Sequence, residues 1–284
     1  MTPKLTVMRI ATWNVNSIRT RVDVVIDFLN EADVDVLAMQ ETKCRNDQFP
    51  LEKFEAAGYD VAHFGLNQWN GVGIASRLPI AEVEEGFPHM PRFSKEQDEG
   101  GSIEARAISA TVQGIRLYSV YVPNGRGLDD PHFDYKLRWL GKLGEYCREY
   151  QDRAGALPLA LAGDFNVAPL DGDVGDPWFK NSGTTHTSPA EREALFNLLK
   201  MTQMQDPVRE REPDGYTFWD YKQGKFEKNE GMRIDFIFTS NDLSSCVSNA
   251  YIASERRLGD RPSDHVPVVV ELDVGDDLDT PMVL

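Results

Sequence analysis

The chain contains 284 residues, of which 41% are hydrophobic and 27% are charged, and its formal net charge is -16. This composition is typical of a soluble globular protein, and the length is enough for one large domain or two small ones. The negative charge argues against casual, nonspecific binding to nucleic acid, because such binding would need a local basic surface and cations that offset clustered carboxylates.

The cysteines and the apolar runs exclude several other classes. The three cysteines form no CxxC pair, so neither a disulfide framework nor a structural zinc site is indicated. The first ten residues lack the apolar centre of a signal peptide, and no apolar run reaches membrane-spanning length. We therefore expect a cytoplasmic monomer that does not associate with membranes.

The amino-terminal half shows short strand patterns separated by few helices. Strand formers or continuous apolar runs predict strands at 7–15, 34–39, 59–64 and 71–76, and a hairpin at 103–112 and 115–122. Helical spacing of apolar residues predicts helices around 22–29 and 49–57. The stretch 79–101 is rich in proline and glycine and predicts a loop.

The carboxyl-terminal half is organised around one buried strand. A long helix is predicted at 131–150, followed by the apolar run LPLALA at 157–162, which ends in Gly-Asp-Phe-Asn. Ser188, Pro189 and Glu191 together predict a helix start with a capping box. Residues 214–221 form an aromatic loop or strand, and further strands are predicted at 233–239, 247–253 and 266–272.

These elements indicate a sandwich of mixed sheets. About ten short strands alternate with only three or four helices, too few for a singly wound sheet in which every crossover is a helix. We expect one domain over residues 7–273, with flexible tails at 1–6 and 274–284.

Polar side chains follow or interrupt most of the predicted strands, and this is the main functional signal. They are Asn14, Glu41, Tyr121, Asp164, Asn166, Asp235, Asp264 and His265. Open sheets place their chemistry at strand ends. Oxygen ligands with at most one histidine suit Mg²⁺ or Mn²⁺ better than zinc. A metal, a carboxylate base and one histidine fit the hydrolysis of a phosphate ester.

Each of these residues also has an ordinary structural interpretation. Asp164 and Asn166 are common turn residues, although strand geometry continued past Asp164 would point both side chains the same way. Glu41 could be a surface acid, and Tyr121 could pack in the core instead of presenting its hydroxyl at a strand end.

His265 has a more specific context than the other histidines. It lies in Ser-Asp-His-Val-Pro, and Asp235 is available to orient its ring, so it could carry a proton in a defined tautomer. No phosphate-binding glycine loop and no Gly-x-Ser-x-Gly turn competes with this interpretation. We interpret the remaining histidines as structural or surface residues: His63, His89, His132 and His186.

Six short segments, in order, resemble the exonuclease III family of abasic-site endonucleases, within the endonuclease/exonuclease/phosphatase superfamily. They are WNVNSIR at 13–19, QETK at 40–43, YVPNG at 121–125, GDFN at 163–166, RID at 233–235 and SDHVP at 263–267. The resemblance extends from about Arg9 to Leu272 and implies a four-layer α/β sandwich, with two packed mixed β-sheets flanked by helices.

The resemblance also implies a divalent-metal site. Glu41 would bind Mg²⁺, for which Mn²⁺ could substitute. Asn14 and Asn16 would assist Glu41, and Asp264 would act through a water molecule.

Catalytic roles follow from the same resemblance. Asp164 would orient or deprotonate the attacking water, with Asn166 beside it. His265, paired with Asp235, would contact the scissile phosphate and stabilise its developing charge. Tyr121 would hydrogen-bond the phosphate or assist the leaving group.

For substrate binding, the resemblance implies an apolar pocket for a baseless sugar, walled by Phe218, Met232 and Ile234, although these residues could also be core. Met232 replaces a tryptophan found in some relatives, which leaves open the balance between abasic-site cleavage and exonuclease activity. Arg126 is a candidate for reaching into the duplex. A local basic surface would consist of Lys43, Arg45, Arg106, Lys222, Lys225 and Arg257.

The implied function is a Mg²⁺-dependent DNA repair nuclease. It would cut duplex DNA 5′ to abasic sites and remove 3′ blocks or nucleotides, as base excision repair requires. Two alternatives remain open: the same chemistry on RNA, a phospholipid or an inositol phosphate, and a non-catalytic interaction protein that keeps the fold. The second would predict missing catalytic residues, and none of the candidates is missing.

Overall fold

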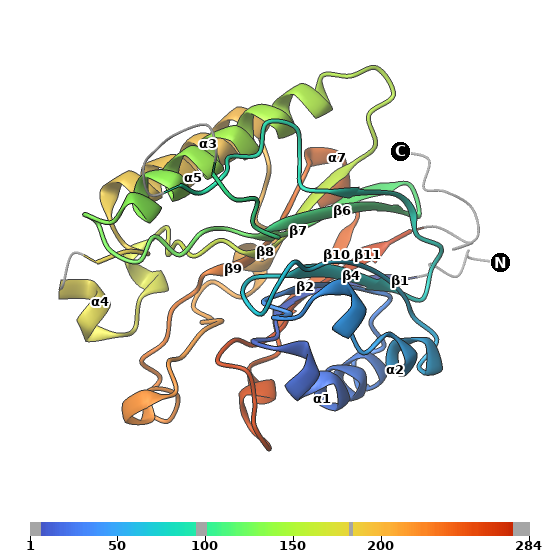
Figure 1. Cartoon of the computed structure of the whole chain (residues 1–284), viewed down its shortest axis with the longest axis horizontal. Coiled ribbons are helices and arrows are strands. Elements are labelled where there is room, and N and C mark those ends of the chain that lie inside the picture. Colours follow the sequence, from blue (N-terminus) through green and yellow to red (C-terminus); the bar gives the residue numbers. More distant parts are fainter. Residues whose placement is uncertain (1–6, 95–100, 182–183, 275–284) are drawn as a thin grey trace.

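The computed structural model describes residues 7–94, 101–181 and 184–274. Two β-sheets pack face to face between two layers of helices (Figure 1). This arrangement confirms the predicted four-layer α/β sandwich. The expected tails, 1–6 and 274–284, lie outside the described residues except for Val274, which packs against the core between the sheets instead of belonging to a flexible tail.

The first sheet has six strands in the order β10-β11-β1-β2-β4-β3. In this sheet β1 and β2 are parallel, and all other neighbouring strands are antiparallel. The bounds are β1 Val7–Asn14, β2 Val36–Gln40, β3 Asp60–Phe64, β4 Val72–Ser76, β10 Val247–Ile252 and β11 Val268–Asp273.

The second sheet has five strands in the order β5-β6-β7-β8-β9, with β7 and β8 parallel. The bounds are β5 Ala81–Glu85, β6 Ala107–Val112, β7 Ile115–Tyr121, β8 Leu159–Asp164 and β9 Asp235–Thr239. The sequence prediction missed β5, which it placed in a loop. All five β5 residues are exposed, and its apolar alternation consists only of Ala81 and Val83, too short a pattern to identify an edge strand within a stretch rich in proline and glycine.

The helices cover the outer faces of the sheets. Figure 1 shows α1 (Ile18–Glu31) and α2 (Leu51–Ala56) beneath the first sheet, and α3 (Pro131–Gln151) and α5 (Pro189–Thr202) above the second. The predicted capping box of α5 is confirmed. Three helices of five residues were not predicted, because so short a segment shows no helical period: α4 Pro177–Asn181, α6 Pro207–Arg211 and α7 Asn241–Ser245.

The central strands are buried on both faces, which explains their continuous apolar sequences. Along β8, Ala160 and Ala162 face the core between the sheets, whereas Leu159 and Leu161 pack toward α3 and α5. No helix in the described parts of the chain is long and apolar enough to cross a membrane.

Strand direction brings the predicted polar residues to one edge of the sandwich. The parallel pairs β1–β2 and β7–β8 end at this edge, and the antiparallel strands β9 and β11 begin there. The register aligns Tyr121 with Asp164, and Asp164 with Asp235. The two sheets therefore present their strand-end side chains to a common space.

Candidate active site

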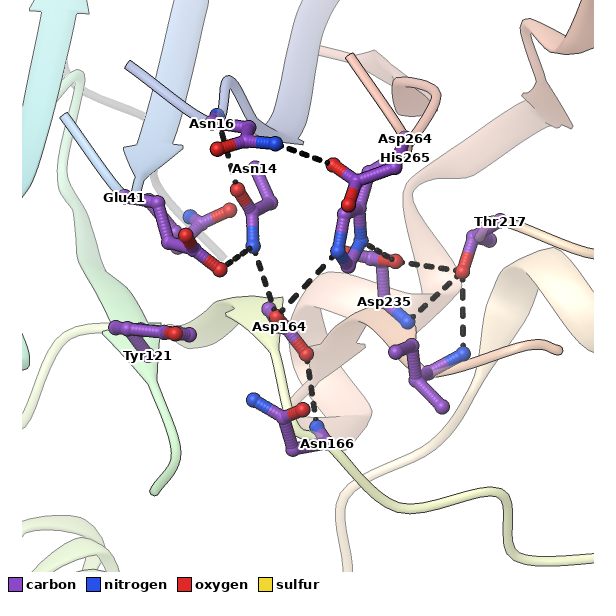
Figure 2. A network of polar contacts seen from close by, with 12 residues as sticks. Asn14, Asn16, Glu41, Tyr121, Asp164, Asn166, Thr217, Asp235, Asp264 and His265 are labelled. Atoms are coloured by element: carbon purple, nitrogen blue, oxygen red, sulfur yellow. Dashed lines mark hydrogen bonds and ion pairs between the residues drawn. The ribbon is translucent and has the colours of Figure 1, made fainter. Parts of the chain in front are cut away.

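Asn14 connects the polar ends of the two sheets (Figure 2). Its side-chain amide donates hydrogen bonds to Glu41 Oε1 at 2.8 Å and to Asp164 Oδ2 at 2.9 Å. Its own Oδ1 accepts from the backbone N–H of Asn16 at 3.1 Å. Asn14 is fully buried and therefore holds two carboxylates in fixed positions.

Glu41 is held as a carboxylate at the end of β2. Its backbone has φ +50°, and its carbonyl accepts from the N–H of Ser17 at 2.7 Å. The Lys43 ammonium lies 2.7 Å from Glu41 Oε2. Burial alone would raise the pKa of Glu41, but the charge of Lys43 and the Asn14 amide hold that pKa below its ordinary value.

The remaining predicted metal ligands lie on the other side of Asn14. Asn16 donates from its side-chain amide to Asp264 Oδ1 at 2.9 Å, and its own oxygen accepts from Lys43 Nζ at 2.5 Å. Asn16 and Asp264 therefore bond to each other, and the Lys43 ammonium, which contacts both Asn16 and Glu41, connects them to Glu41.

A second group could bind a cation directly. Glu41, Asp164 and His265 each offer one ligand atom, and these atoms lie within 4.8 Å of one another. The two carboxylates are oxygen donors of the type that hard divalent cations prefer, and Asn14 holds them together despite their like charges. The residues present therefore fit a divalent metal, and the predicted ligand Glu41 is among them.

His265 is oriented by a buried carboxylate, as the sequence predicted. Its Nδ1 lies 2.8 Å from Asp235 Oδ2, and its Nε2 lies 3.9 Å from Asp164 Oδ2. Thr217 completes this arrangement: its hydroxyl donates to Asp235 Oδ2 at 2.6 Å and accepts from the N–H groups of Ile234 and Asp235 at 3.1 Å. Sequence reasoning missed Thr217, because a threonine in an aromatic loop carries no distinctive signal.

Neighbouring charges shift the pKa values of His265 and Asp164. Burial would lower the pKa of His265, but the negative charges of Asp235 and Asp164 raise it above its ordinary value and favour the imidazolium. Burial, and then the negative charge of Asp235, raise the pKa of the Asp164 carboxyl. Both side chains are almost completely buried, so these charges act with little screening by water.

Asn166 does not continue the strand, because β8 ends at Asp164 and Asn166 has φ +52°. Its backbone N–H donates to Asp164 Oδ1 at 2.8 Å, and its side-chain amide donates to the Val122 carbonyl at 2.9 Å. The ring Nε2 of His186 lies 3.0 Å from Asn166 Oδ1. His186, which we interpreted as a structural or surface residue, therefore contacts the site, and nothing in its local sequence indicates this.

Tyr121 lies at the end of β7 beside Glu41 (Figure 2) and is partly exposed. Burial, and then the negative charge of Glu41, raise the pKa of its phenol well above the ordinary value, so the hydroxyl is protonated. The guanidinium of Arg106 lies 4.8 Å from the centre of the Tyr121 ring. Arg106 was expected on the basic surface, and this was wrong: it is 4% exposed and donates to Glu104 at 2.6 Å.

The predicted pocket residues form an apolar cluster next to His265. Met232 and Ile234 are 1% and 2% exposed and lie at the back of this cluster, whereas Phe218 is partly exposed. The Phe218 ring lies 4.9 Å from the imidazole of His265. The part of the cluster that a substrate can reach is therefore formed by Phe218, with the partly buried Phe179 packed against the same core.

The other predicted substrate contacts lie in loops around the same edge. Arg126 is exposed, has φ +60°, and holds its guanidinium 5.2 Å from the centre of the Phe93 ring. Lys222 is exposed, whereas Lys225 pairs with Asp176 at 3.0 Å. Much of the predicted basic surface is thus neutralised by neighbouring acids.

Comparisons with known proteins agree with this geometry. A model of the endonuclease/exonuclease/phosphatase family matches residues 11–265. Exodeoxyribonuclease III from Haemophilus influenzae is 27% identical over 274 residues, covering 93% of this chain and 99% of that protein.

Two solved structures are similar over nearly their whole length. A 3′ phosphatase from Neisseria bound to a product DNA hairpin is 37% identical, with a TM-score of 0.84 over 94% of this chain and 99% of that chain. An AP endonuclease from Archaeoglobus fulgidus is 35% identical, with a TM-score of 0.83 over 94% of this chain and 100% of that chain. The fold, the order of the strand-end motifs and these matches identify the chain as a member of the endonuclease/exonuclease/phosphatase family, among its exonuclease III-like nucleases.

Proposed function

We propose that this protein is a Mg²⁺-dependent DNA repair nuclease that cuts duplex DNA 5′ to abasic sites and removes blocking groups or nucleotides from 3′ ends. One observation carries the proposal. The buried carboxylate of Asp164 lies between the acid Glu41 and an imidazole, His265, that Asp235 holds in place. A base, an oriented cationic ring and a place for a metal are the groups that phosphodiester hydrolysis needs.

Asp164 is the proposed base for the attacking water. The Asn14 amide and the Asn166 backbone N–H donate to different oxygens of its carboxylate and fix its plane. Because its pKa is raised, this carboxylate takes up a proton more readily than an ordinary aspartate. Water held beside it would be aligned for attack on a phosphorus atom.

His265 and Tyr121 are the proposed partners of the phosphate. The imidazolium of His265 carries its positive charge next to Asp164 and is unable to rotate while Nδ1 bonds to Asp235. It would stabilise the charge that develops on the phosphoryl oxygens. The protonated Tyr121 phenol would donate a hydrogen bond to the phosphate or to the leaving oxygen.

Glu41, held by the Asn14 amide, is the residue that would bind the divalent cation. Asn16 and Asp264, which bond to each other and reach Glu41 through the Lys43 ammonium, would support it. When bound, such a cation polarises a phosphoryl oxygen and offsets the negative charge of the substrate. We propose Mg²⁺ because the donors are oxygens, and Mn²⁺ as a substitute.

A DNA substrate is supported by the relatives and by the surroundings of the site. Relatives of the chain are named exodeoxyribonuclease III and AP endonuclease, and one was solved with a DNA hairpin. Phe218, in front of the buried Met232 and Ile234, offers an apolar surface for a sugar without a base. Arg126 provides an exposed positive charge in the loop after β7, whereas Lys43 is paired with Glu41.

The net charge of -16 favours one alternative, a phosphodiesterase or phosphatase that acts on RNA, a phospholipid or an inositol phosphate. A direct comparison of substrates tests the choice. Initial rates would be measured in Mg²⁺ on an abasic-analogue duplex, a nicked duplex with a 3′-phosphate, a matching RNA duplex and a soluble inositol phosphate. We expect the two DNA substrates to be cleaved fastest, and faster turnover of RNA or inositol phosphate would reject the DNA assignment.

A further inference from the structure

Beneath the catalytic loops, a lysine and a glutamate form an ion pair that is completely buried. Lys136 lies on α3 and Glu191 in the first turn of α5, and the exposed fraction of both side chains is 0%. Such residues are rarely buried fully unless they are paired. We propose that this pair is a positioning device that holds the backbone of three loops in the arrangement that hydrolysis requires. The inference rests on the hydrolytic function proposed above.

The Lys136 ammonium has three N–H donors, and each has an acceptor. One donates to Glu191 Oε1. The other two donate to backbone carbonyls of the catalytic loops, Asn166 at 2.7 Å and Asn124 at 3.2 Å. Lys136 therefore connects the loop after β7 with the loop after β8.

Glu191 extends the connection to a third loop. Its Oε1 also accepts from the backbone N–H of His186 at 2.8 Å. Its Oε2 accepts from the backbone N–H of Ser188 at 3.1 Å and from the Ser188 hydroxyl at 2.6 Å. The ion pair thus joins two helices and three loops at one buried point.

The loops held in this way have backbone conformations that need support. Asn166 has φ +52°, His186 has φ +78° and Gly125 has φ +97°. Residues other than glycine adopt this left-handed region at an energetic cost, so external hydrogen bonds are needed to maintain it. At Asn166, Lys136 holds the carbonyl while the N–H donates to Asp164 Oδ1.

The side chains of the three loops meet above the ion pair. Asn166 Oδ1 accepts from the Asn124 amide at 3.3 Å and lies 3.0 Å from His186 Nε2. A displacement of any one loop would therefore move Asn166, and through its N–H the carboxylate of Asp164. This chain of contacts connects a buried pair on the helices to the proposed base.

Stability alone does not explain the pair. Removing two charges from water is costly, and apolar residues of similar volume often replace a buried ion pair without loss of stability. An apolar pair is unable to form the bonds to the loops, namely those to the Asn124 and Asn166 carbonyls, the His186 N–H and both groups of Ser188. The charges supply loop geometry that apolar packing lacks.

The paired variant Lys136→Met/Glu191→Leu separates positioning from folding. A single substitution would leave one charge buried without its partner and could prevent folding. We expect the paired variant to fold, with a midpoint of thermal unfolding lowered by several degrees, because the Glu191 side-chain half of the α5 capping box and the bonds to the loops are lost. Because misplaced catalytic groups cost rate more than binding, kcat on the abasic-analogue duplex should fall by about 10- to 100-fold while KM changes by less than about threefold.

A matched control uses the exposed ion pair of the same helix. Lys142 and Glu145 are 47% and 52% exposed, so Lys142→Met/Glu145→Leu should change neither kcat nor KM. Combination with Asp164→Asn gives a second test. If the buried pair acts by positioning the Asp164 carboxylate through the Asn166 N–H, the fall in kcat that it causes should shrink to less than about threefold in that background. Full additivity would assign the pair to general stability.

Hydrogen–deuterium exchange gives a readout that needs no substrate. Peptides covering 122–127 and 164–168 should exchange faster in the paired variant, whereas peptides from β1 and β2 should be unchanged. If the wild type cleaves none of the substrates but the loops still loosen, the positioning role stands and the proposed function fails. Unchanged loop exchange together with unchanged kcat in an active enzyme would overturn the inference.

Discussion

At the scale of single residues, Thr217 controls the orientation of His265 from a position that the sequence does not mark. Its hydroxyl donates to Asp235 Oδ2, the oxygen that also faces His265 Nδ1. In Thr217→Val, Asp235 loses this bond and two backbone N–H groups lose their acceptor. We predict that kcat falls by about tenfold with little change in KM, and that the free energy of unfolding falls by about 1–3 kcal/mol.

Steady-state kinetics and urea denaturation would check this prediction. Thr111→Val is a suitable control, because the Thr111 hydroxyl bonds to Glu82 on the exposed edge of the second sheet. Thr217→Val with wild-type kcat would show that the bond to Asp235 has no catalytic role.

His132 makes the protein sensitive to acid. It is 2% exposed, and its Nδ1 accepts from the N–H of Gly125 at 3.1 Å, which requires a neutral ring. Burial, and then the positive charges of Arg106 and Arg126, lower its pKa from 6.5 to about 4. Between these two pH values, His132 is protonated in the unfolded chain and neutral in the folded protein. The free energy of unfolding therefore decreases as the pH falls from about 6.5 toward about 4.

The variant His132→Gln should remove this loss and keep an acceptor for Gly125. Between about pH 7.5 and about pH 5, the wild type should lose about 1–2 kcal/mol more stability than the variant, as measured by urea denaturation. The exposed His89, changed to Gln, serves as a control for the same substitution outside the core. Identical pH dependence for wild type and His132→Gln would contradict the account.

The strand-end acids could be predicted from the sequence, because they directly follow buried apolar runs. Thr217 and His186 could not. Their partners, Asp235 and Asn166, lie 18 and 20 residues away across loops whose paths depend on tertiary packing. Lys136 had a usable signal, since it follows Phe133 by three residues and precedes Leu140 by four, on the apolar face of a predicted helix.

At the scale of elements, the close approach of β7 and β8 fixes the spacing of catalytic residues. A Cβ added to Gly163 would lie 1.9 Å from the Val120 carbonyl oxygen. Gly163→Ala should therefore separate the two strands next to Tyr121 and Asp164, cost about 3 kcal/mol or more, and abolish activity. In contrast, a Cβ added to Gly141, at an exposed position of α3, meets no atom within 4 Å, so Gly141→Ala should stabilise the protein by about 0.5–1 kcal/mol.

Thermal unfolding of the two glycine variants would measure both effects. A Gly163→Ala protein as stable as wild type would show that the strands can separate without cost.

The elements themselves were predictable where they were long and periodic, as for α3 and β8. They were missed where the element was too short to show a clear pattern, as in the exposed β5 and in α6.

At the scale of the whole molecule, the site exists only because the two sheets face each other. Asn14 and Asp164 are 150 positions apart in the chain and bond at 2.9 Å. Neither periodicity nor composition determines which sheet faces which, so this arrangement could be expected only from the order of six motifs that resemble a known family. Arg106, expected on a basic surface, is instead buried with a local partner, Glu104.

The whole-molecule charge also bears on the function. A chain with a net charge of -16 repels DNA, and Lys43 and Lys225 are paired with acids at the site. Productive binding should therefore depend on divalent cations that offset the carboxylates, as well as on the apolar surface at Phe218.

The most direct measurement is cleavage of a duplex that carries one abasic-site analogue, in Mg²⁺ and in chelator, by the wild type and by Asp164→Asn. We predict a metal-dependent nick 5′ to the lesion that leaves a 3′-hydroxyl. Asp164→Asn should bind the duplex normally in fluorescence anisotropy and cleave it about 10²- to 10⁴-fold more slowly, because the proton acceptor is lost. Asp171→Asn, on the exposed loop nearby, should cleave like the wild type. Cleavage that persists in chelator, or near-normal turnover by Asp164→Asn, would contradict the account.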